Sequence, residues 1–552
     1  MTRRPSGRLA SLLRSGSVHS AAMKFDLRHG WATVAVVALT GASAALLVSA
    51  SHRASARAPS SSQSPSVSTK SQSAAAATVS IDAAITEQVR AAIAKSGLGP
   101  HVTAVVGDLD RDAVIVDLGG SRPMRPASNQ KAITTGLAMM VLGEGFSFGT
   151  KLLLQGDRLT IVGDGDPSLG DPELLSGTVW KDAQGAMHTG LTPEQLVDQW
   201  ARAVERLRVP RIREVVVDDR IFAREGAHPD WPRDQLDATY CVACWGINFH
   251  FNSLRFWLSP KDGKVAWRTQ PSAPWLTVVN DATARQGKGA KQSAGIARAQ
   301  GTDAYAIKGN LAKADGPYIV TMQDPPLFLG NLLASRLRTN GVDVGSVRLA
   351  TAGDAAATGT AVGPTLSTPL ASVVARANTD SENLYAEALL KRAAAKSTGR
   401  PGSWADGQDL MRTTLRAAIG TDVESFAIRD GSGMSKENRV TAMGMTRWLL
   451  AMPRMLPDFN AYLQSFAEGG SSGTLKKRMD EVPDSLAKVW CKTGYIAGTS
   501  CLSGYVVCAN GRRFAMSVLC NDLNDSQVGK AKDLQDAVAA ILARQPARQA
   551  SR

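Results

Sequence analysis

Hydrophobic and polar positions change their period several times along the chain, and each period predicts a different element. From Ile81 to Gly97 apolar residues recur every three or four positions, which predicts a helix. The runs 101–110 and 113–119 alternate between apolar and polar residues instead, as the two strands of a hairpin do. A second helical pattern covers residues 128–142. The first part of the chain is therefore expected to contribute both helices and sheet.

The middle and the end of the chain have different patterns. Between 147 and 364 short apolar runs are interrupted by Gly, Pro and Asp, which indicates mostly strands. Residues 365–450 are helical again, 487–522 predict three consecutive antiparallel strands, and the closing segment is helical. Because the outer parts share a character that the middle lacks, we expect one split α+β domain, 81–146 with 365–546. The region 147–364 is then an insertion, mostly β, that holds two nested domains.

Length and composition favour several domains rather than one. The chain has 552 residues, of which 44% are hydrophobic and 20% charged, an ordinary globular composition. Its net charge is +14, but the first 80 residues hold nine basic residues and one acidic residue and so carry +8 of it. The remainder shows no dense Lys/Arg stripe with interleaved aromatic residues, so the charge gives no reason to expect nucleic-acid binding.

The N-terminal part of the chain has the pattern of an export signal. Residues 31–50 contain no charge, follow a basic stretch and are long enough to span a bilayer. They are also rich in Ala and Ser, so residues 1–50 can be either a cleaved signal peptide or a membrane anchor. Residues 51–80 have almost no large apolar side chain and predict a disordered linker. We expect a protein that is exported to the periplasm or cell envelope.

The six cysteines suit an oxidising compartment without defining a disulfide-rich scaffold. Cys241 and Cys244 form a C-x-x-C pair, but no second pair or nearby His completes a zinc set, so we expect no metal site. If 510–511 is a two-residue turn, Cys501 lies opposite Cys520 in a hairpin. A structural disulfide and two buried free thiols both remain open there.

Three short motifs carry the candidate chemistry. The first pairs Ser128 with Lys131 at the start of a predicted helix, where both side chains share one face and the amine can take the proton of the hydroxyl. The helix N-terminus favours negative charge that develops nearby. A plain helix start with a solvated lysine fits the same residues, so this motif alone is not decisive.

The other two motifs are ambiguous for the same reason. Ser381 and Asn383 begin another amphipathic helix and can offer a hydroxyl and an amide to a substrate, although Thr379 and Glu382 also match a capping box. Residues 492–494, Lys-Thr-Gly, end a predicted strand and place a cation and a hydroxyl beside a Gly that lets a ligand approach the backbone. The specific signal is the ordered set S-x-x-K, S-x-N and K-T-G, because it is the active-site pattern of penicillin-binding proteins and serine β-lactamases.

Two other hydrolase patterns fit less well. Residues 469–473 match G-x-S-x-G, but the residues before them are helical in pattern. The last histidine of the chain is His250, whereas a nucleophile-elbow hydrolase needs its His after the serine. No H-E-x-x-H occurs, so zinc-dependent hydrolysis lacks its ligands.

The chain resembles the penicillin-binding protein 4 type of D-alanyl-D-alanine carboxypeptidase and endopeptidase, the class C low-molecular-mass enzymes of peptidase family S13. The resemblance covers residues 82–545 and includes, besides the motifs, PASNQK (126–131), GDGDPSL (163–169), VVDDRIF (216–222), DGSGMSKENRVT (430–441), SGTLKKRM (472–479) and KTGYIAGTSCLSGYV (492–506). It implies an α+β, multi-domain fold in which a transpeptidase-like domain, an antiparallel sheet flanked by helices, carries large inserted domains. The long gap between the first two motifs suits such insertions, whereas single-domain β-lactamases have no room for it.

The resemblance implies a serine peptidase that needs no cofactor and acts on peptidoglycan stem peptides. Ser128 would attack the carbonyl of a D-Ala-D-Ala bond or a D-amino-acid cross-link, with Lys131 as its base. Burial and the positive charge of Lys492 would both lower the pKa of that lysine. Ser381, helped by Asn383, would pass the proton to the leaving amine, and water would then release the acyl-enzyme. β-Lactam antibiotics would inhibit the enzyme by acylating the same serine.

The remaining implied residues bind substrate. Lys492 and Thr493 would hold the substrate carboxylate beside Gly494, and the backbone N–H groups of Ser128 and Tyr495 would form the oxyanion hole. In the inserted region, Asp218 loosely matches an aspartate that in relatives contacts the amino end of the peptide's diamino acid. A strand-end Asp that caps a turn explains this residue equally well.

The chain departs from the family pattern in three places. Glu382 stands where relatives often have Asp, Tyr495 follows Lys-Thr-Gly where a small hydroxyl residue is common, and residues 237–252 stray from a Tyr-Gly-Ala-Pro-like stretch. Two alternatives stay open: a β-lactamase, which would need a dedicated base for fast deacylation, and a catalytically idle cell-wall-binding protein. Carboxypeptidase and endopeptidase activities use one site, so the sequence does not separate them.

Overall fold

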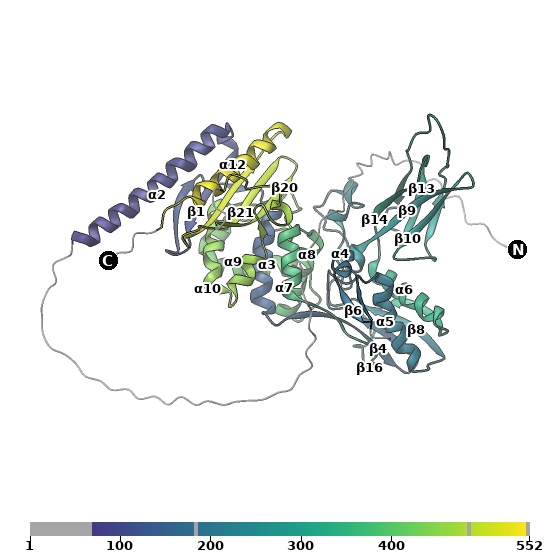
Figure 1. Ribbon diagram of the computed structural model, residues 1–552. Helices are drawn as coiled ribbons and strands as arrows, with labels where there is room; N and C mark the ends of the chain where they lie inside the picture. The colour runs from purple at the N-terminus through teal and green to yellow at the C-terminus, as the bar shows by residue number, and fades with distance from the viewer. Residues whose placement is uncertain (1–68, 182–185, 483–486, 548–552) are drawn as a thin grey trace, which may run out of the picture.

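The computed structural model describes residues 69–181, 186–482 and 487–547. The predicted signal or anchor at 31–50 and the linker residues 51–68 lie outside these ranges. Within the described ranges, no helix has the combination of length and apolar character that crossing a membrane requires. The described chain forms two lobes, which lie at the left and right of Figure 1.

An antiparallel sheet forms the centre of the first lobe. Its strands are β1 (Val102–Asp108), β2 (Ala113–Leu118), β19 (Ala467–Glu468), β20 (Lys488–Ile496), β21 (Thr499–Val507) and β22 (Arg513–Asn521). The order is β19-β20-β21-β22-β1-β2, so a strand near the start of the described chain pairs with one near its end. The predicted first hairpin and the three consecutive strands are confirmed. A small second ladder joins β3 (Pro123–Met124) to β18 (Val440–Thr441).

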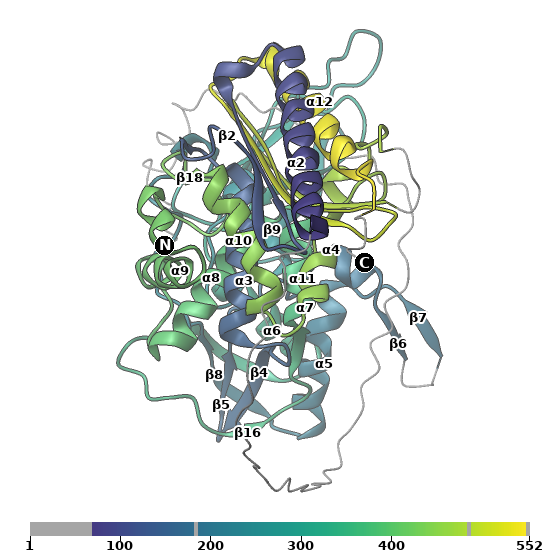
Figure 2. The same ribbon diagram turned by 90° about the vertical axis from the view of Figure 1, so that its left-hand side faces the viewer.

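Helices cover both faces of this sheet, as Figures 1 and 2 show. They are α2 (Thr69–Ser96), α3 (Gln130–Leu142), α7 (Leu370–Ala375), α8 (Asn383–Thr398), α9 (Trp404–Ile419), α10 (Ala442–Met455), α11 (Phe459–Gln464) and α12 (Asp525–Ala543). α2 and α12 pack on one face, where Val89 and Val538 share a core with Val518 of β22. The next residue of that strand, Leu519, faces the opposite core with Leu137 of α3, because successive side chains of a strand alternate.

The second lobe is built on a mixed sheet. Its strands are β4 (Ser147–Gln155), β5 (Arg158–Val162), β8 (Arg211–Asp218), β15 (Asp343–Leu349) and β16 (Thr360–Ala361), with β17 (Leu366–Pro369) also paired to β4. β5, β8 and β15 run parallel. The helices α4 (Pro172–Ser176), α5 (Pro193–Arg206) and α6 (Pro325–Thr339) belong to this lobe, and Trp200 and Leu333 are buried in its core. Ser147 pairs with Pro369, so the two chain crossings between the lobes run side by side.

A smaller module of short sheets extends from the second lobe, at the upper right of Figure 1. One sheet contains β9 (Ser253–Lys261), β10 (Lys264–Gln270) and β14 (Asp315–Thr321), and the other contains β11 (Thr277–Asn280), β12 (Gly295–Arg298) and β13 (Ala304–Lys308). A separate hairpin, β6 (Val179–Lys181) with β7 (Met187–Thr189), projects from the lobe in Figure 2.

Two parts of the chain, residues 69–80 and the inserted region, differ from what the sequence pattern predicted. α2 begins at Thr69, so the linker prediction is wrong for residues 69–80, where four consecutive alanines favour a helix. The inserted region also holds the two long helices α5 and α6 in addition to its strands. The first of these has a capping box between Thr192 and Gln195 and a Pro at the first helical position, which are local signals of a helix start.

The cysteine prediction is corrected by the strand register. Val507 pairs with Arg513, so five residues rather than two connect β21 to β22. The register therefore moves by one residue, and Cys501 pairs with Leu519 instead of Cys520. All six cysteines are buried free thiols, which decides between the two alternatives for this pair.

Candidate active site

Ser128 lies in a tight turn that precedes α3 rather than inside the helix. The 3₁₀ turn Ala127–Asn129 leads into α3, whose first residue is Gln130. Ala127 has a φ of +45°, a left-handed conformation that non-glycine residues rarely adopt and that is concentrated at functional sites. A Cβ on Gly433 would lie 1.8 Å from the carbonyl oxygen of Ala127, so only glycine allows the neighbouring loop to approach this turn.

Lys131 connects three separate parts of the chain. Its Nζ donates to Ser128 Oγ at 2.8 Å, to Asn383 Oδ1 at 2.6 Å and to the carbonyl oxygen of Ser432 at 3.0 Å. The lysine is fully buried, whereas Ser128 is half-buried. The structure thus joins the first two predicted motifs through direct hydrogen bonds to one amine.

Burial controls the protonation of this amine. It lowers the pKa of Lys131 to about 8, against the carboxylates of Glu387, Asp430 and Glu382, which raise it. Burial, followed by the charge of Lys131, lowers the pKa of Lys492 well below its usual value. The two lysines therefore lie close enough for repulsion to favour the loss of a proton from the pair.

Ser381 and Asn383 occupy the junction between a π-helical turn and α8. The π turn Arg376–Asp380 ends at Ser381, which has a φ of +69°. Both features are rare and are associated with functional sites. Asn383 is the first residue of α8, and its Nδ2 donates to the carbonyl oxygen of Tyr240 at 2.7 Å. Because Tyr240 lies between 147 and 364, the inserted region directly supports a residue that contacts Lys131.

The predicted capping box at this junction is wrong. Glu382 itself occupies the N-cap position of α8 and makes no side-chain cap, while the Thr379 hydroxyl donates to the carbonyl oxygen of Ser465 at 2.7 Å. Burial raises the pKa of Glu382 to about 7, opposed by the guanidinium of Arg376. A carboxyl group that changes charge near neutral pH therefore lies beside Asn383.

The third motif lies on β20, next to the turn that carries Ser128. Lys492 is fully buried and donates to the carbonyl oxygen of Thr493 at 3.1 Å. Thr493 Oγ1 donates to Thr474 Oγ1 at 2.8 Å. A Cβ on Gly494 would lie 2.6 Å from the carbonyl oxygen of Pro126. The glycine therefore allows β20 to lie against the turn that carries Ser128. The sequence predicted that it allows a ligand to approach the backbone.

Two tyrosines beside this group of residues are exposed. Tyr495 follows Gly494 on β20 and is 60% exposed, and it pairs with Ser500 of β21. Tyr240, whose carbonyl holds Asn383, is 50% exposed and its hydroxyl donates to Gln235 Oε1 at 3.2 Å. Aromatic surfaces from both lobes are therefore available next to the candidate site.

Sequence reasoning missed a buried carboxylate behind Lys131. Glu387 is fully buried on α8 and accepts hydrogen bonds from the backbone N–H groups of Gly431 at 3.0 Å and Ser432 at 2.8 Å, and from Trp404 Nε1 at 2.8 Å. Burial and the nearby Asp430 raise its pKa to about 7. It lies four residues after Asn383 on one helix face, a spacing that could have indicated the pair.

Asp430 holds the rest of the same loop. It accepts from the backbone N–H groups of Gly433 and Ser435 and from Asn438 Nδ2 and Trp231 Nε1, at 2.7–2.8 Å. Trp231 belongs to the inserted region, so this loop is also tied to the second lobe. The two carboxylates fix the backbone that offers the Ser432 carbonyl to Lys131.

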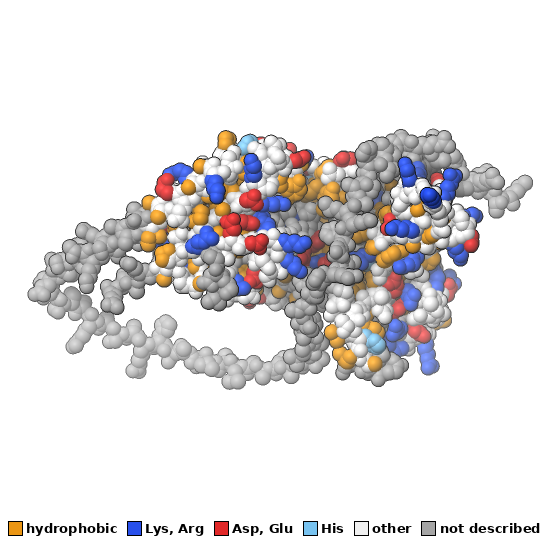
Figure 3. All heavy atoms as spheres, turned by 45° about the horizontal axis from the view of Figure 1, so that its top comes forward, with side chains coloured by type: hydrophobic (Ala, Val, Ile, Leu, Met, Phe, Trp, Pro, Cys, Tyr) orange, Lys and Arg blue, Asp and Glu red, His pale blue; other side chains and the backbone are white. Residues whose placement is uncertain are grey.

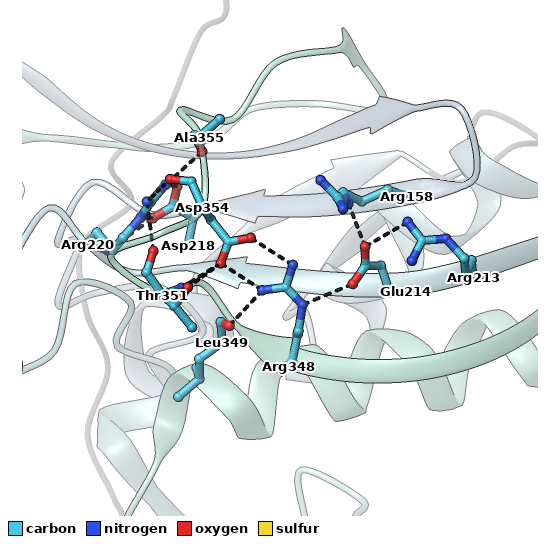
Figure 4. A network of polar contacts seen from close by, with 10 residues as sticks. All are labelled: Arg158, Arg213, Glu214, Asp218, Arg220, Arg348, Leu349, Thr351, Asp354 and Ala355. Atoms are coloured by element: carbon cyan, nitrogen blue, oxygen red, sulfur yellow. Dashed lines mark hydrogen bonds and ion pairs between the residues drawn. The ribbon is translucent and has the colours of Figure 1, made fainter.

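Asp218 lies at the end of β8 in the second lobe, and no contact among the described residues links it to the three motifs. Its carboxylate accepts from Arg220 Nε at 2.8 Å and Nη2 at 2.7 Å, and from the Arg220 backbone N–H at 3.2 Å (Figure 4). The same guanidinium donates to the carbonyl oxygens of Thr351, Asp354 and Ala355. These bonds fit the turn-capping interpretation, and the substrate contact stays a prediction.

Known proteins resemble this chain over most of its length. The model of the D-Ala-D-Ala carboxypeptidase 3 (S13) family matches residues 85–545. The D-alanyl-D-alanine carboxypeptidase of Actinomadura sp. (strain R39) is 27% identical over 471 residues, 81% of this chain and 82% of that protein. Carboxypeptidase DacB of Mycolicibacterium smegmatis is 26% identical over 459 residues, 82% of each chain.

The fold also matches a solved structure. Penicillin binding protein 4 (dacB) from Haemophilus influenzae superposes with a TM-score of 0.62 at 20% identity, covering 80% of this chain and 95% of that one. This match confirms the predicted α+β, multi-domain fold. Together with the three motifs and the extent of the family match, it shows that the chain belongs to the D-Ala-D-Ala carboxypeptidase 3 (S13) family.

Proposed function

We propose that the protein is a serine-type D-alanyl-D-alanine carboxypeptidase and endopeptidase that acts on peptidoglycan stem peptides through an acyl-enzyme on Ser128. The observation that carries this proposal is the bridge from Lys131 Nζ to Ser128 Oγ and Asn383 Oδ1. A buried amine within hydrogen-bond distance of a hydroxyl is the arrangement that activates a serine nucleophile without a histidine. Membership of the family supports the same chemistry.

In the proposed reaction Lys131 is the base. Ser128 Oγ attacks the carbonyl carbon of the D-Ala-D-Ala bond while its proton passes to the neutral Lys131 amine. Ser381 relays that proton to the departing amine nitrogen, the C–N bond breaks, and an ester to Ser128 remains. Water then attacks the ester, returns the hydroxyl to Ser128 and releases the shortened peptide.

The other motif residues bind substrate in this proposal. Lys492 and Thr493 lie on β20 and hold the C-terminal carboxylate, while the backbone N–H groups of Ser128 and Tyr495 stabilise the oxyanion. The close approach of Gly494 to Pro126 supports this assignment, because it places the strand against the turn that carries Ser128. A D-amino-acid cross-link fits the same scheme as a terminal D-Ala.

The organisation of the chain is part of the proposal. We assign residues 81–146 with 365–546 to a catalytic domain and 147–364 to an insertion of two nested domains. The side-by-side crossings at Ser147 and Pro369 and the separate cores of the two lobes support this division. Export through 31–50, as a cleaved signal or a membrane anchor, would bring the enzyme to the peptidoglycan of the cell envelope.

Penicillin labelling tests the proposal. Penicillin binding protein 4 from Haemophilus influenzae has been solved in complex with a β-lactam. A β-lactam acylates a serine without losing its amine, because the opened ring stays attached, so a stable adduct is expected here. The purified full-length protein should bind fluorescent penicillin with a stoichiometry of one, measured by gel and by intact mass.

Two variants make the result specific. Ser128→Ala should abolish the adduct, whereas Ser471→Ala, at the exposed serine of the G-x-S-x-G stretch, should label like the unmodified protein. A folded protein that takes up no penicillin would overturn the proposal in favour of an idle cell-wall-binding protein. Rapid turnover of penicillin would favour a β-lactamase. Muropeptides with a free D-Ala-D-Ala end or a cross-link then separate the two peptidase activities.

A further inference from the structure

The small outer module of the second lobe carries an unusual share of the charge. Residues 81–552 have a net charge of +6, because +8 of the total +14 lies in the first 80 residues. Residues 261–313 hold nine basic and three acidic side chains, a net charge of +6 in about a tenth of the chain. The rest of the two lobes is therefore electrically balanced, and the positive charge is concentrated in this module.

The fold brings these basic residues together from three chain segments. The turn between β9 and β10 begins and ends with Lys261 and Lys264, which pair with each other. Lys264 bridges to Thr283, and Thr283 bridges to Asn310. The turn, the loop 283–294 and the segment 308–313 therefore meet at one end of the module.

Asn310 holds this end in a defined shape. Its Oδ1 accepts from Thr283 Oγ1 and from the Arg285 backbone N–H, both at 2.9 Å. Its Nδ2 donates to the carbonyl oxygens of Arg285 at 3.1 Å and Lys291 at 2.9 Å. The neighbouring Gln292 Oε1 accepts from the backbone N–H groups of Ala312 and Lys313. The lysine-bearing loop is thus hydrogen-bonded to its surroundings at several points.

We call this surface the basic face. Its members are exposed and are Lys261, Lys264, Arg285, Lys288, Lys291, Lys308 and Lys313. Figure 3 shows Lys and Arg side chains gathered on the upper part of the right-hand lobe. Two acidic residues of the module, Asp262 and Asp281, are equally exposed. Gathering like charges costs free energy through self-repulsion, which a bound anion offsets.

The surroundings of the basic face favour a hydrophilic polyanion as its partner. The large hydrophobic side chains that are exposed among the described residues all lie outside 261–313. The face therefore lacks the aromatic platform on which single-stranded nucleic acid stacks and the apolar side chains that enter a lipid surface. Trp257 is covered by Arg268, whose guanidinium carbon lies 4.0 Å from the ring centre.

We propose that the basic face binds the carboxylate groups of peptidoglycan strands and holds the enzyme on its polymer. This inference rests on the proposed function, because the stem peptides of the substrate polymer carry free carboxylates along every strand. A second contact on the same polymer converts each later encounter with the active site into an intramolecular event and raises the effective substrate concentration. The contact should weaken with salt, because exposed charges are screened within about 10 Å at 0.1 M ionic strength.

Binding to purified sacculi tests this proposal. The test is a cosedimentation assay that compares the full-length protein with a Lys288→Glu, Lys291→Glu double variant. The sacculi are stripped of covalently attached phosphate polymers, and the assay is repeated over a range of NaCl concentrations. The double variant should bind at least tenfold more weakly at low salt, with a shallower salt dependence. The matched variant Lys530→Glu, Lys532→Glu changes the net charge equally on exposed positions of α12 and should bind like the unmodified protein.

Acylation by penicillin separates this inference from the proposed function. Both double variants should be labelled at the rate of the unmodified protein, because the substitutions lie outside the catalytic residues. Equal binding by the two double variants would overturn the inference, as would binding that requires attached phosphate polymers or that favours anionic lipid vesicles over sacculi. If the unmodified protein takes up no penicillin, the proposed function is overturned. The comparison of sacculus binding between the two double variants can still be read.

Discussion

Lys131 has three hydrogen-bond acceptors for three ammonium protons. In the charged form each proton has a partner: Ser128, Asn383 and the carbonyl of Ser432. When the amine loses one proton, the Asn383 and Ser432 oxygens can still accept hydrogen bonds from the two remaining N–H groups. The nitrogen lone pair then faces the Ser128 hydroxyl. The Asn383 Oδ1 and Ser432 carbonyl oxygens cannot donate a hydrogen bond, so they direct the lone pair of the neutral amine toward the Ser128 hydroxyl.

The first prediction concerns the pH dependence of acylation. The rate should rise with pH as Lys131 becomes neutral, with a midpoint near its pKa of about 8. Charged groups around Lys131 act on this midpoint. Glu387, Asp430 and Glu382 raise the pKa of Lys131. Lys492 and Lys131 repel each other. Glu387→Gln removes the largest of the three negative contributions, so the midpoint should move below 8. Stopped-time labelling with penicillin from pH 6 to pH 10 measures it.

The matched control is Glu437→Gln, at an exposed position of the same loop. It should leave the midpoint unchanged. The plateau rate of Glu387→Gln should also fall, because an amide cannot accept all the N–H groups that now meet the carboxylate. A lower rate at every pH with an unmoved midpoint would show that Glu387 has a structural role alone.

At this scale the sequence predicted which side chains of the motifs meet but missed the residues that support them. Ser128, Lys131 and Asn383 were found because their spacing within short motifs determines which side chains meet. Glu387 shares a helix face with Asn383, but the loop that it holds lies more than 40 residues further along the chain. Tyr240 was missed because its contact with Asn383 forms only when a distant segment packs against α8. The Tyr240 contact uses a backbone carbonyl, which any residue type offers.

Strand β20 and the Ser128 turn form one structural unit. Gly494 touches Pro126 and Asn129, so a Cβ at this position would lie 2.6 Å from the Pro126 oxygen and 3.1 Å from Asn129 Oδ1. Backbone atoms cannot move aside as the end of a flexible side chain can. The distance between Lys492 and Ser128 therefore depends on the absence of a side chain at Gly494.

The second prediction follows from this contact. Gly494→Ala should separate β20 from the turn and slow acylation by penicillin about 100-fold, since misplacement by about 1 Å costs this much in positioned reactions. The comparison is Gly529→Ala in α12, where a Cβ meets no atom within 4 Å. That variant should label normally and gain about 0.5–1 kcal/mol in stability. Equal labelling rates in the two variants would contradict the role given to the Gly494 contact.

Elements with a strong local pattern were predicted well. The three strands β20 to β22 and the closing helix follow from continuous apolar runs and helical periodicity. The helices of the second lobe were missed although Thr192 and Gln195 form a capping box, because frequent Gly and Pro nearby favoured strands. The hairpin register was wrong by one residue, since loop length depends on the turn geometry of residues 508–512, which composition does not determine.

At the scale of the whole molecule, an ion cluster joins the two lobes beside the turn that ends at Ser381. Arg376 on the π turn pairs with Asp171 at 3.1 Å and Glu173 at 2.8 Å in the second lobe, and with Asp380 at 2.6 Å. Asp171 is fully buried and also accepts from the Tyr385 hydroxyl. The turn that ends at Ser381 is thus fixed by charges from the inserted region.

The third prediction tests this connection. Arg376→Ala leaves Asp171 buried without its cation, which should destabilise the protein by about 3–5 kcal/mol, the cost of breaking a buried ion pair. Arg416→Ala, which removes an exposed partner of Glu424, should cost less than about 1 kcal/mol. Urea denaturation followed by tryptophan fluorescence compares the two variants. Similar midpoints would show that the Arg376 cluster does not hold the lobes together.

The pairing of β1 with β22 determines how much of the chain must be synthesised before the first lobe can fold. Ser128 is synthesised long before Lys492, and β1 has no neighbour on one side until residues 513–521 exist. A nascent or truncated chain that stops before them carries Ser128 but lacks the strand that completes the sheet around β1. Under the proposed function we expect such a chain to be inactive, so that peptidoglycan is cut only by copies that have been made beyond residue 521.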